Sequence, residues 1–253
     1  MTTELTCDDF LGGRLRIFQP ARGYRAGADA VMLAAACPAA AGETVLELGC
    51  GAGVASLCLA RRVAGLRLTG LERQTDYAAL ARRNAEANAL PLTVIEGDLA
   101  AAPPLLKGAS FDHVLMNPPF FLGGTAAPDG GRATARSEET PLAAWLDAAL
   151  RRLKPKGWLT VIQRADRLDG LIHGLHGRAG ALTILPLAAR EGREAGRVIL
   201  WARKGARAPL RLLAPFVIHA GGRHEADGED LTPDAAAVLR EAAPIRPVIA
   251  KLP

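Results

Sequence analysis

The 253-residue sequence is poor in the features that mark several common protein classes. Its four cysteines have neither the density of a disulfide-bonded scaffold nor CxxC spacing, so we expect reduced thiols in a cytoplasmic protein. The longest apolar stretch, residues 31–41, is too short to span a membrane and contains Pro38. The acidic N-terminus has no apolar stretch of the kind found in signal peptides. We therefore expect neither a membrane partner nor a secreted disulfide protein.

The sequence also offers little material for a serine hydrolase or a metal centre. It has three serines, none of them within G-x-S-x-G. Asp169, His173 and His176 would share one helix face and imitate a metal site of two histidines and one carboxylate. Glycines interrupt that helix, however, and no other ligand cluster is evident. We expect these three side chains to lie on a solvated surface, and we expect no bound metal.

Positive charge exceeds negative charge, and most of it is arginine. The chain has 31 Lys and Arg against 26 Asp and Glu, a formal net charge of +5, and only five of the basic residues are lysine. Arginine suits bidentate contact with phosphate, although an alanine- and arginine-rich composition can also be a genomic bias. Basic side chains gather in residues 190–211, against only Glu191 and Glu194. This basic segment is either a solvated face or a contact for an RNA backbone, so the charge permits an RNA partner without demonstrating one.

Apolar runs of strand type alternate with helical patterns from residue 43 onward. Strands are predicted at residues 43–48, 66–72, 92–98, 111–116, 158–163, 181–187 and 197–204. Helices are predicted at residues 54–63, 76–90 and 142–153, the second of them after Thr75 as the N-cap. This alternation predicts an α/β fold with a mostly parallel central sheet that helices cover on both faces.

Two extensions flank this core within what we expect to be a single domain of residues 1–253. Residues 1–42 form an N-terminal extension that ends in a helix, and residues 43–204 form the α/β core. Residues 205–253 form a C-terminal extension with a strand near residues 210–219 and a short helix from Pro233.

A glycine-rich turn joins the first core strand to the first core helix. LELGCGAG (46–53) carries Gly49, Gly51 and Gly53, with Glu47 shortly before them. Glycine allows a sharp turn and close approach of a ligand to the backbone, and the helix start offers free N–H groups. Val54 breaks the G-x-G-x-x-G pattern of dinucleotide-binding proteins. The spacing E-x-G-x-G-x-G instead resembles the first motif of class I S-adenosylmethionine-dependent methyltransferases, which have a Rossmann-like fold.

This resemblance implies roles for residues at three successive strand ends. In the family the glycine loop, which here includes Cys50 as a small packing residue, passes under the amino-acid end of the cofactor, next to Glu47. Glu72 ends the second predicted strand, where the family's carboxylate accepts the ribose hydroxyl hydrogens. Asp98 ends the third, where the family places a side chain beside the adenine. Either acid alone would be ordinary in an α/β protein, but three strand ends in register favour S-adenosylmethionine as the cofactor.

The fourth predicted strand runs into Asn117-Pro118-Pro119-Phe120 and must stop there, because proline cannot extend a central sheet ladder. These residues resemble the (N/D)-P-P-(Y/F/W) motif of methyltransferases that modify planar amino groups. The resemblance implies that the Asn117 side chain and the Pro118 carbonyl accept the two N–H hydrogens of the amine, so that the lone pair of the amine points at the methyl group. It also implies that Asn117 faces the cofactor. Pro119 fixes the backbone, and Phe120 offers a face for a flipped base.

The likeness to one group of methyltransferases covers nearly the whole chain. Residues 10–36 and several segments of the C-terminal half are similar to the bacterial tRNA1(Val) adenine-37 N6-methyltransferases. In that group a G-x-D-(A/G) element opens a helix over the cofactor; here it contains Gly27 and Asp29, and Arg25 precedes it. The resemblance implies methyl transfer to N6 of an adenine next to a tRNA anticodon, with Arg25, Gly27 and Asp29 binding the cofactor.

Other acceptors stay open at this point. Many members of the group have tyrosine where this chain has Phe120, and NPPF is frequent among guanine-N2 rRNA methyltransferases. Protein-glutamine N5-methyltransferases of the release-factor type share NPP(Y/F), but they carry an N-terminal helical domain for which residues 1–42 leave little room. A non-catalytic binding module would not need the intact motif. The glycine-rich segment 121–139 is either a lid over the target base or disordered, and the sequence leaves the oligomeric state unknown.

Overall fold

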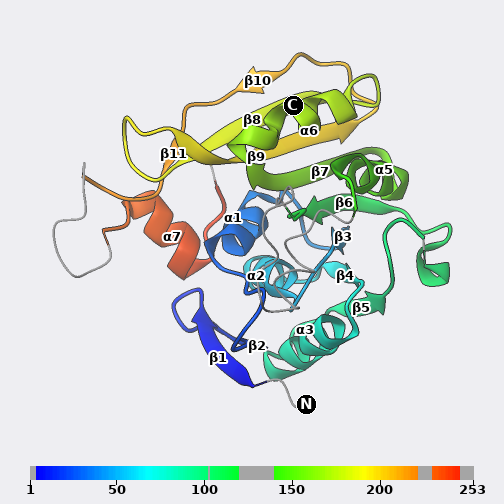
Figure 1. The fold of residues 1–253 in the computed structure, drawn as a ribbon, viewed down its shortest axis with the longest axis vertical. Helices are drawn as coiled ribbons and strands as arrows, with labels where there is room; N and C mark the ends of the chain where they lie inside the picture. The colour runs from blue at the N-terminus through cyan, green and yellow to red at the C-terminus, as the bar shows by residue number, and fades with distance from the viewer. Residues whose placement is uncertain (1–3, 102, 120–139, 222–229, 246–253) are drawn as a thin grey trace.

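A nine-stranded sheet forms the centre of the protein in the computed structural model, which describes residues 4–101, 103–119, 140–221 and 230–245 (Figure 1). Its strand order is β10-β8-β9-β7-β6-β3-β4-β5, and β11 also pairs with β8. The strands are β3 (Thr44–Leu48), β4 (Arg67–Glu72), β5 (Thr93–Glu96), β6 (Phe111–Met116), β7 (Leu153–Arg164), β8 (Ala179–Ala188), β9 (Ala195–Lys204), β10 (Arg211–Leu212) and β11 (Phe216–Val217).

Most strand pairs are parallel, as the alternating pattern predicts. The pairs β3–β4, β4–β5, β3–β6 and β6–β7 are all parallel, so the carboxyl ends of these five strands meet at one edge of the sheet. Only β9 runs against its neighbours β7 and β8 among the paired strands of the described sheet. The start of β9 therefore lies at the same edge as those carboxyl ends, and its end lies at the opposite edge. Open α/β sheets bind their ligands at the carboxyl edge.

Helices cover both faces of the sheet, which confirms the predicted fold class (Figure 1). Successive residues of β6 show the alternation: Leu115 packs into one buried cluster, whereas Val114 and Met116 pack into the other. The first cluster includes residues of α1 (Ala28–Ala36), α2 (Val54–Arg62), α3 (Thr75–Ala87) and α7 (Pro233–Glu241), and the second includes residues of α5 (Leu142–Arg152) and α6 (Leu168–Leu175). Across the described part of the chain, none of these helices has the length and apolarity to cross a membrane.

A β-hairpin precedes α1, and the sequence analysis did not predict it. β1 (Leu5–Phe10) and β2 (Leu15–Pro20) form a separate antiparallel sheet. Asn84 of α3 and Asn88, the C-cap residue of that helix, bind the backbone of β2 as a neighbouring strand would. The Asn84 side chain accepts from the Phe18 N–H at 2.8 Å and donates to the Phe18 carbonyl at 3.0 Å, and Asn88 does the same with Arg16 at 2.9 and 2.8 Å. Asn84 also donates to the Ala52 carbonyl in the glycine turn at 2.9 Å, so one buried amide joins the hairpin to that turn.

Several predicted boundaries differ from the structure. Thr75 is the first residue of α3 and Gln74 is its N-cap, so Thr75 is not the cap that we predicted. β5 ends at Glu96, which leaves Asp98 two residues beyond the strand rather than at its end. The predicted strand near residues 210–219 is two short strands, β10 and β11.

The short C-terminal helix begins at Pro233, as predicted, and Thr232 caps it by accepting from the Ala235 N–H at 3.2 Å. Asp169, His173 and His176 are exposed, which confirms that this face of α6 and the residue after it meet solvent. The predictions for Phe120 and for the segment 121–139 concern residues outside those that the structure describes.

Candidate active site

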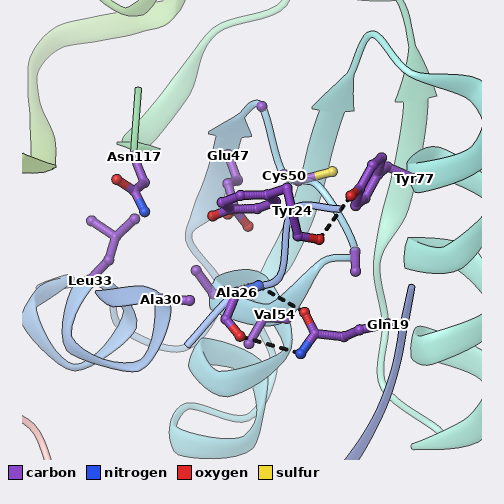
Figure 2. Close-up of a pocket in the computed structure, with 13 residues that line it drawn as sticks. Gln19, Tyr24, Ala26, Ala30, Leu33, Glu47, Cys50, Val54, Tyr77 and Asn117 are labelled. Atoms are coloured by element: carbon purple, nitrogen blue, oxygen red, sulfur yellow. Dashed lines mark hydrogen bonds between the residues drawn. The ribbon is translucent and has the colours of Figure 1, made fainter. Parts of the chain in front are cut away.

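A pocket with an empty volume of about 400 Å³ opens beside the carboxyl ends of β3 and β6 (Figure 2). The lining comes from β2, the segment before α1, α1, β3, the glycine turn, α2, α3 and the residue after β6. Its members are Gln19, Tyr24, Ala26, Ala30, Leu33, Glu47, Gly49, Cys50, Ala52, Val54, Ala55, Tyr77 and Asn117.

The glycine turn needs glycine for conformation and for space. Gly49, Gly51 and Gly53 have φ values of +65°, +53° and +83°, in the left-handed region that other residues rarely adopt. A Cβ atom on Gly49 would also lie 2.5 Å from the Trp145 ring of α5. The turn therefore brings its backbone to the pocket wall while α5 packs directly behind it.

Glu47 is a buried carboxyl group in the pocket wall at the end of β3. Its Oε2 accepts hydrogen bonds from both the backbone N–H, at 2.9 Å, and the hydroxyl group of Ser56 in α2. Burial raises the pKa of Glu47 to about 7, although the Ser56 hydrogen bonds oppose this shift, and the nearby Glu72 charge raises it further. The pocket thus contains an acid whose charge changes near neutral pH.

Glu72, at the end of β4, binds the backbone around the pocket with both of its oxygens. Oε2 accepts from the Gly51 N–H at 2.9 Å and Oε1 accepts from the Gln74 N–H at 2.9 Å. The carboxylate therefore fixes the glycine turn against the start of α3, and each oxygen keeps a lone pair for another donor. Asp98 lies outside the pocket lining, and its Oδ1 accepts from the Ala100 N–H at 2.8 Å in the turn after β5.

Residues 23–27, which we call the strap, lie along the pocket before α1. The Tyr24 ring is next to the glycine turn, because a Cβ on Gly51 would be 3.8 Å from its Cε1 (Figure 2). The Tyr77 hydroxyl donates to the Tyr24 carbonyl at 2.8 Å. Gln19 of β2 accepts from the Ala26 N–H at 2.8 Å and donates to its carbonyl at 3.3 Å. Burial raises the pKa of the Tyr24 phenol, with further contributions from Asp29 and Glu47, so the phenol stays neutral.

The predicted cofactor contacts Arg25 and Asp29 make ion pairs within the protein and are not part of the pocket lining. The Arg25 guanidinium lies 2.6 Å from Asp8 and donates to the Thr6 hydroxyl at 2.6 Å, which ties the strap to the hairpin. Asp29 pairs with Arg197 of β9 at 3.0 Å. Gly27 is the N-cap of α1, also outside the lining. Residues on both sides of the predicted boundary at residue 43 line the pocket, because β2, the strap and α1 form one wall of it.

Asn117 lines the pocket and Pro118 is buried behind it, so the structure brings the NPP motif to the glycine turn (Figure 2). The lining includes four of the predicted residues, namely Asn117, Glu47, Gly49 and Cys50. Gly51 and Gly53 lie in the same turn, and Glu72 of β4 accepts a hydrogen bond from the Gly51 N–H. Gln19, Tyr77 and Gln163 belong to no motif that the sequence shows, so no role was predicted for them. Gln19 carried one usable signal, because it is a polar residue where a strand-like run ends at Pro20.

The basic segment 190–211 does not form one surface. Arg190 binds Asp230 and Arg197 binds Asp29, both near the carboxyl edge. Arg203 and Lys204 lie at the opposite edge, where the Arg203 guanidinium is 5.4 Å from the Trp158 ring centroid and Lys204 donates to a backbone carbonyl. These basic residues lie at two different edges because β9 crosses the sheet between them.

The methyltransferase small domain is the family whose model matches this chain, over residues 27–174. The chain belongs to the small methyltransferase family. The tRNA1(Val) (adenine(37)-N6)-methyltransferase of Porphyromonas gingivalis is 36% identical over 173 residues, which cover 65% of this chain and 68% of that protein. The protein of the same name from Shewanella baltica is 31% identical over 184 residues, covering 70% and 76%. The structure of a predicted O-methyltransferase from Agrobacterium tumefaciens is 27% identical, with a TM-score of 0.70, and covers 85% of this chain and 97% of that one.

As a small methyltransferase, the protein is an S-adenosylmethionine-dependent enzyme with the class I fold. The resemblance that the NPPF motif and residues 10–36 predicted is confirmed at the level of the family. The left-handed glycine turn and the carboxyl groups of Glu47 and Glu72 fit the cofactor, because they provide close backbone approach and acids that can face a cation. The roles of the individual site residues stay predictions.

Proposed function

We propose that the protein transfers a methyl group from S-adenosylmethionine to N6 of an adenine in tRNA, in the cytoplasm. The observation that carries the proposal is Asn117-Pro118-Pro119 beside the glycine turn, with Asn117 in the pocket lining. The names of the relatives from Porphyromonas gingivalis and Shewanella baltica support adenine N6 in tRNA as the acceptor. The four free cysteines fit a reducing compartment.

The motif suits an amine whose lone pair is delocalised into an aromatic ring. The Asn117 Oδ1 and the Pro118 carbonyl oxygen are both acceptors, and an exocyclic amine has two N–H groups to donate. Holding both N–H groups turns the amine so that its lone pair faces the cofactor side of the pocket. Bound S-adenosylmethionine supplies an electrophilic methyl group on a sulfonium. That methyl group would pass to the amine nitrogen held by Asn117 and the Pro118 carbonyl, which would leave a neutral thioether on the cofactor and release one proton from the amine.

The pocket walls have separate tasks in this proposal. The glycine turn and Glu72 would hold the ribose and amino-acid parts of the cofactor, and Glu47 would face its positive charge. The Tyr24 ring and Leu33 would exclude water on the strap and α1 sides, since both line the pocket. Excluding water strengthens the polar contacts that hold the reacting groups.

The first test is methyl transfer from radiolabelled S-adenosylmethionine to unmodified bulk tRNA, with rRNA and a peptide release factor in parallel. Nucleoside mass spectrometry identifies the labelled product. We expect label in N6-methyladenosine from tRNA. Label in N2-methylguanosine from rRNA, or in the release factor, would overturn the acceptor while keeping the methyltransferase.

Asn117→Ala is the matched mutational test of the site. We expect single-turnover methyl transfer to fall about 100-fold or more, because one of the two acceptors that position the amine is lost. We expect the cofactor Kd from calorimetry to change by less than about threefold, since Asn117 contributes only one part of the lining. Methyl transfer at the wild-type rate would contradict the role of the motif.

A further inference from the structure

Gln163 has a buried side-chain amide next to the Pro118 carbonyl, one of the two proposed hydrogen-bond acceptors for the target amine. No feature of its sequence context predicted a role for it. It lies one residue before the end of β7 and is 2% exposed. Its Nε2 donates a hydrogen bond to the Pro118 carbonyl oxygen at 3.1 Å. Its Oε1 accepts from the Arg164 N–H at 2.9 Å. The two contacts together fix which end of the amide is the donor, since a flipped amide would place its oxygen against the Pro118 oxygen.

The register of the sheet explains why this contact exists. β6 and β7 are parallel, and Met116 is paired with Val161. Two residues further along each strand, Pro118 is level with Gln163. Proline has no N–H and cannot continue the ladder, so backbone pairing stops at this level. The Gln163 side chain supplies a donor to the carbonyl where the ladder no longer does.

We infer that Gln163 is a positioning residue for methyl transfer, because it holds the Pro118 carbonyl in the orientation that accepts the target amine. The inference rests on the proposed function of the NPP motif. A carbonyl oxygen has two lone pairs. Gln163 occupies one of them from within the sheet, which leaves the other for an N–H of the substrate. Without Gln163, the carbonyl loses the side-chain hydrogen bond that holds it against β7.

The burial of the amide indicates that the contact is maintained for a reason. A buried amide without hydrogen bonds costs roughly 1–3 kcal/mol, and an apolar side chain of the same size would avoid that cost. Thr160, three residues earlier on β7, is also buried, but its hydroxyl has no hydrogen-bond partner in the part of the chain that the structure describes. Thr160→Val is therefore the matched control, since it removes a buried polar group from the same strand.

Gln163→Leu tests the inference in single-turnover assays at saturating cofactor, on whichever acceptor the wild-type protein methylates. We expect the rate to fall about 10- to 100-fold, as when reacting groups are misplaced by a fraction of an ångström to an ångström. We expect the cofactor Kd to stay within about twofold of wild type, and the rate of Thr160→Val to do the same. A Gln163→Leu rate within twofold of wild type would overturn the inference. So would a loss of rate matched by an equal loss of cofactor affinity, because that would indicate a general distortion of the pocket.

Gln163→Glu gives a second readout that a structural role alone would not produce. An ionised carboxylate would face the Pro118 oxygen and repel it, whereas a protonated carboxyl group can donate to it as the amide does. We expect the ratio of the variant rate to the wild-type rate to rise as the pH is lowered from about 8.5 to about 6. A ratio that is constant over this range would overturn the inference. If the wild type methylates guanine or glutamine instead of adenine, the proposed substrate fails while the Gln163 measurement still stands, since the same carbonyl receives each of these amines.

Discussion

Glu47→Gln should make the free energy of unfolding less sensitive to alkaline pH, because in the wild type Glu47 must ionise inside the folded protein. Its pKa is raised to about 7 from an ordinary 4.5, chiefly by burial. Below pH 4.5 the carboxyl group is neutral in both the folded and the unfolded chain, so its favourable contribution is fully present. As the pH rises toward 7, the unfolded chain ionises first and the folded state loses stability. Above about pH 7 this loss is complete.

The magnitude follows from the two pKa values. Each pKa unit corresponds to about 1.4 kcal/mol, so the difference between 4.5 and about 7 corresponds to roughly 3 kcal/mol of unfolding free energy. Glutamine can keep the local contacts, because both Ser56 hydrogen bonds go to a single oxygen, Oε2, which the amide oxygen can replace. The substitution therefore removes the titration with little change in packing.

The assay is urea denaturation of wild type and Glu47→Gln at pH 5 and pH 8. Other titrating groups are common to both proteins, so they cancel in the difference between the two unfolding free energies. We expect this difference to shift by about 2–3 kcal/mol in favour of the variant between pH 5 and pH 8, or by roughly 4–12 °C in Tm for a protein of this size. A difference that does not change with pH would refute the assignment of a buried, neutral Glu47.

Two further substitutions test the glycine turn. Glu72→Gln should lower the free energy of unfolding by about 1.5–3 kcal/mol at pH 5 and at pH 8, and it should weaken cofactor binding. The carboxylate uses both oxygens for backbone N–H groups, whereas an amide has only one acceptor. Urea denaturation and calorimetry that match the wild type would contradict this. Gly49→Ala should lower the free energy of unfolding clearly more than Gly13→Ala does. Gly13 also has a positive φ, +83°, but a Cβ atom there would meet open space, whereas one on Gly49 would meet the Trp145 ring. Equal losses would mean that α5 moves aside without cost.

The sequence predicted the parts of the site that local chemistry determines. The spacing of Gly49, Gly51 and Gly53 alone predicts a strand-to-helix turn, and the two prolines after Asn117 predict the end of a strand. The parallel sheet then brings these strand ends to one edge, so the meeting of Glu47 and Asn117 in one pocket followed from the fold.

The sequence did not predict what depends on pairing between distant elements. Gln163 contacts Pro118 because β6 and β7 have one particular register, and register is not readable from either strand alone. The strap contacts depend on Gln19 of the hairpin, and Arg25 makes an ion pair with Asp8 of that same hairpin. These contacts join segments whose pairing the sequence pattern does not show. Position relative to a motif indicated that Arg25 was near the cofactor, but not which partner its guanidinium would take.

The hydrogen bonds from Asn84 and Asn88 to the backbone of β2 have a consequence for how the protein is made. Asn84 binds Phe18, which precedes it by 66 residues, and it also binds Ala52. During translation the hairpin leaves the ribosome well before α3, so the backbone of Arg16 and Phe18 lacks the hydrogen bonds from Asn88 and Asn84 until α3 has emerged. The pocket wall that the hairpin supports therefore cannot be complete before α3 has been made. We expect a nascent chain that ends before α3 to bind no cofactor, although it already contains the whole glycine turn.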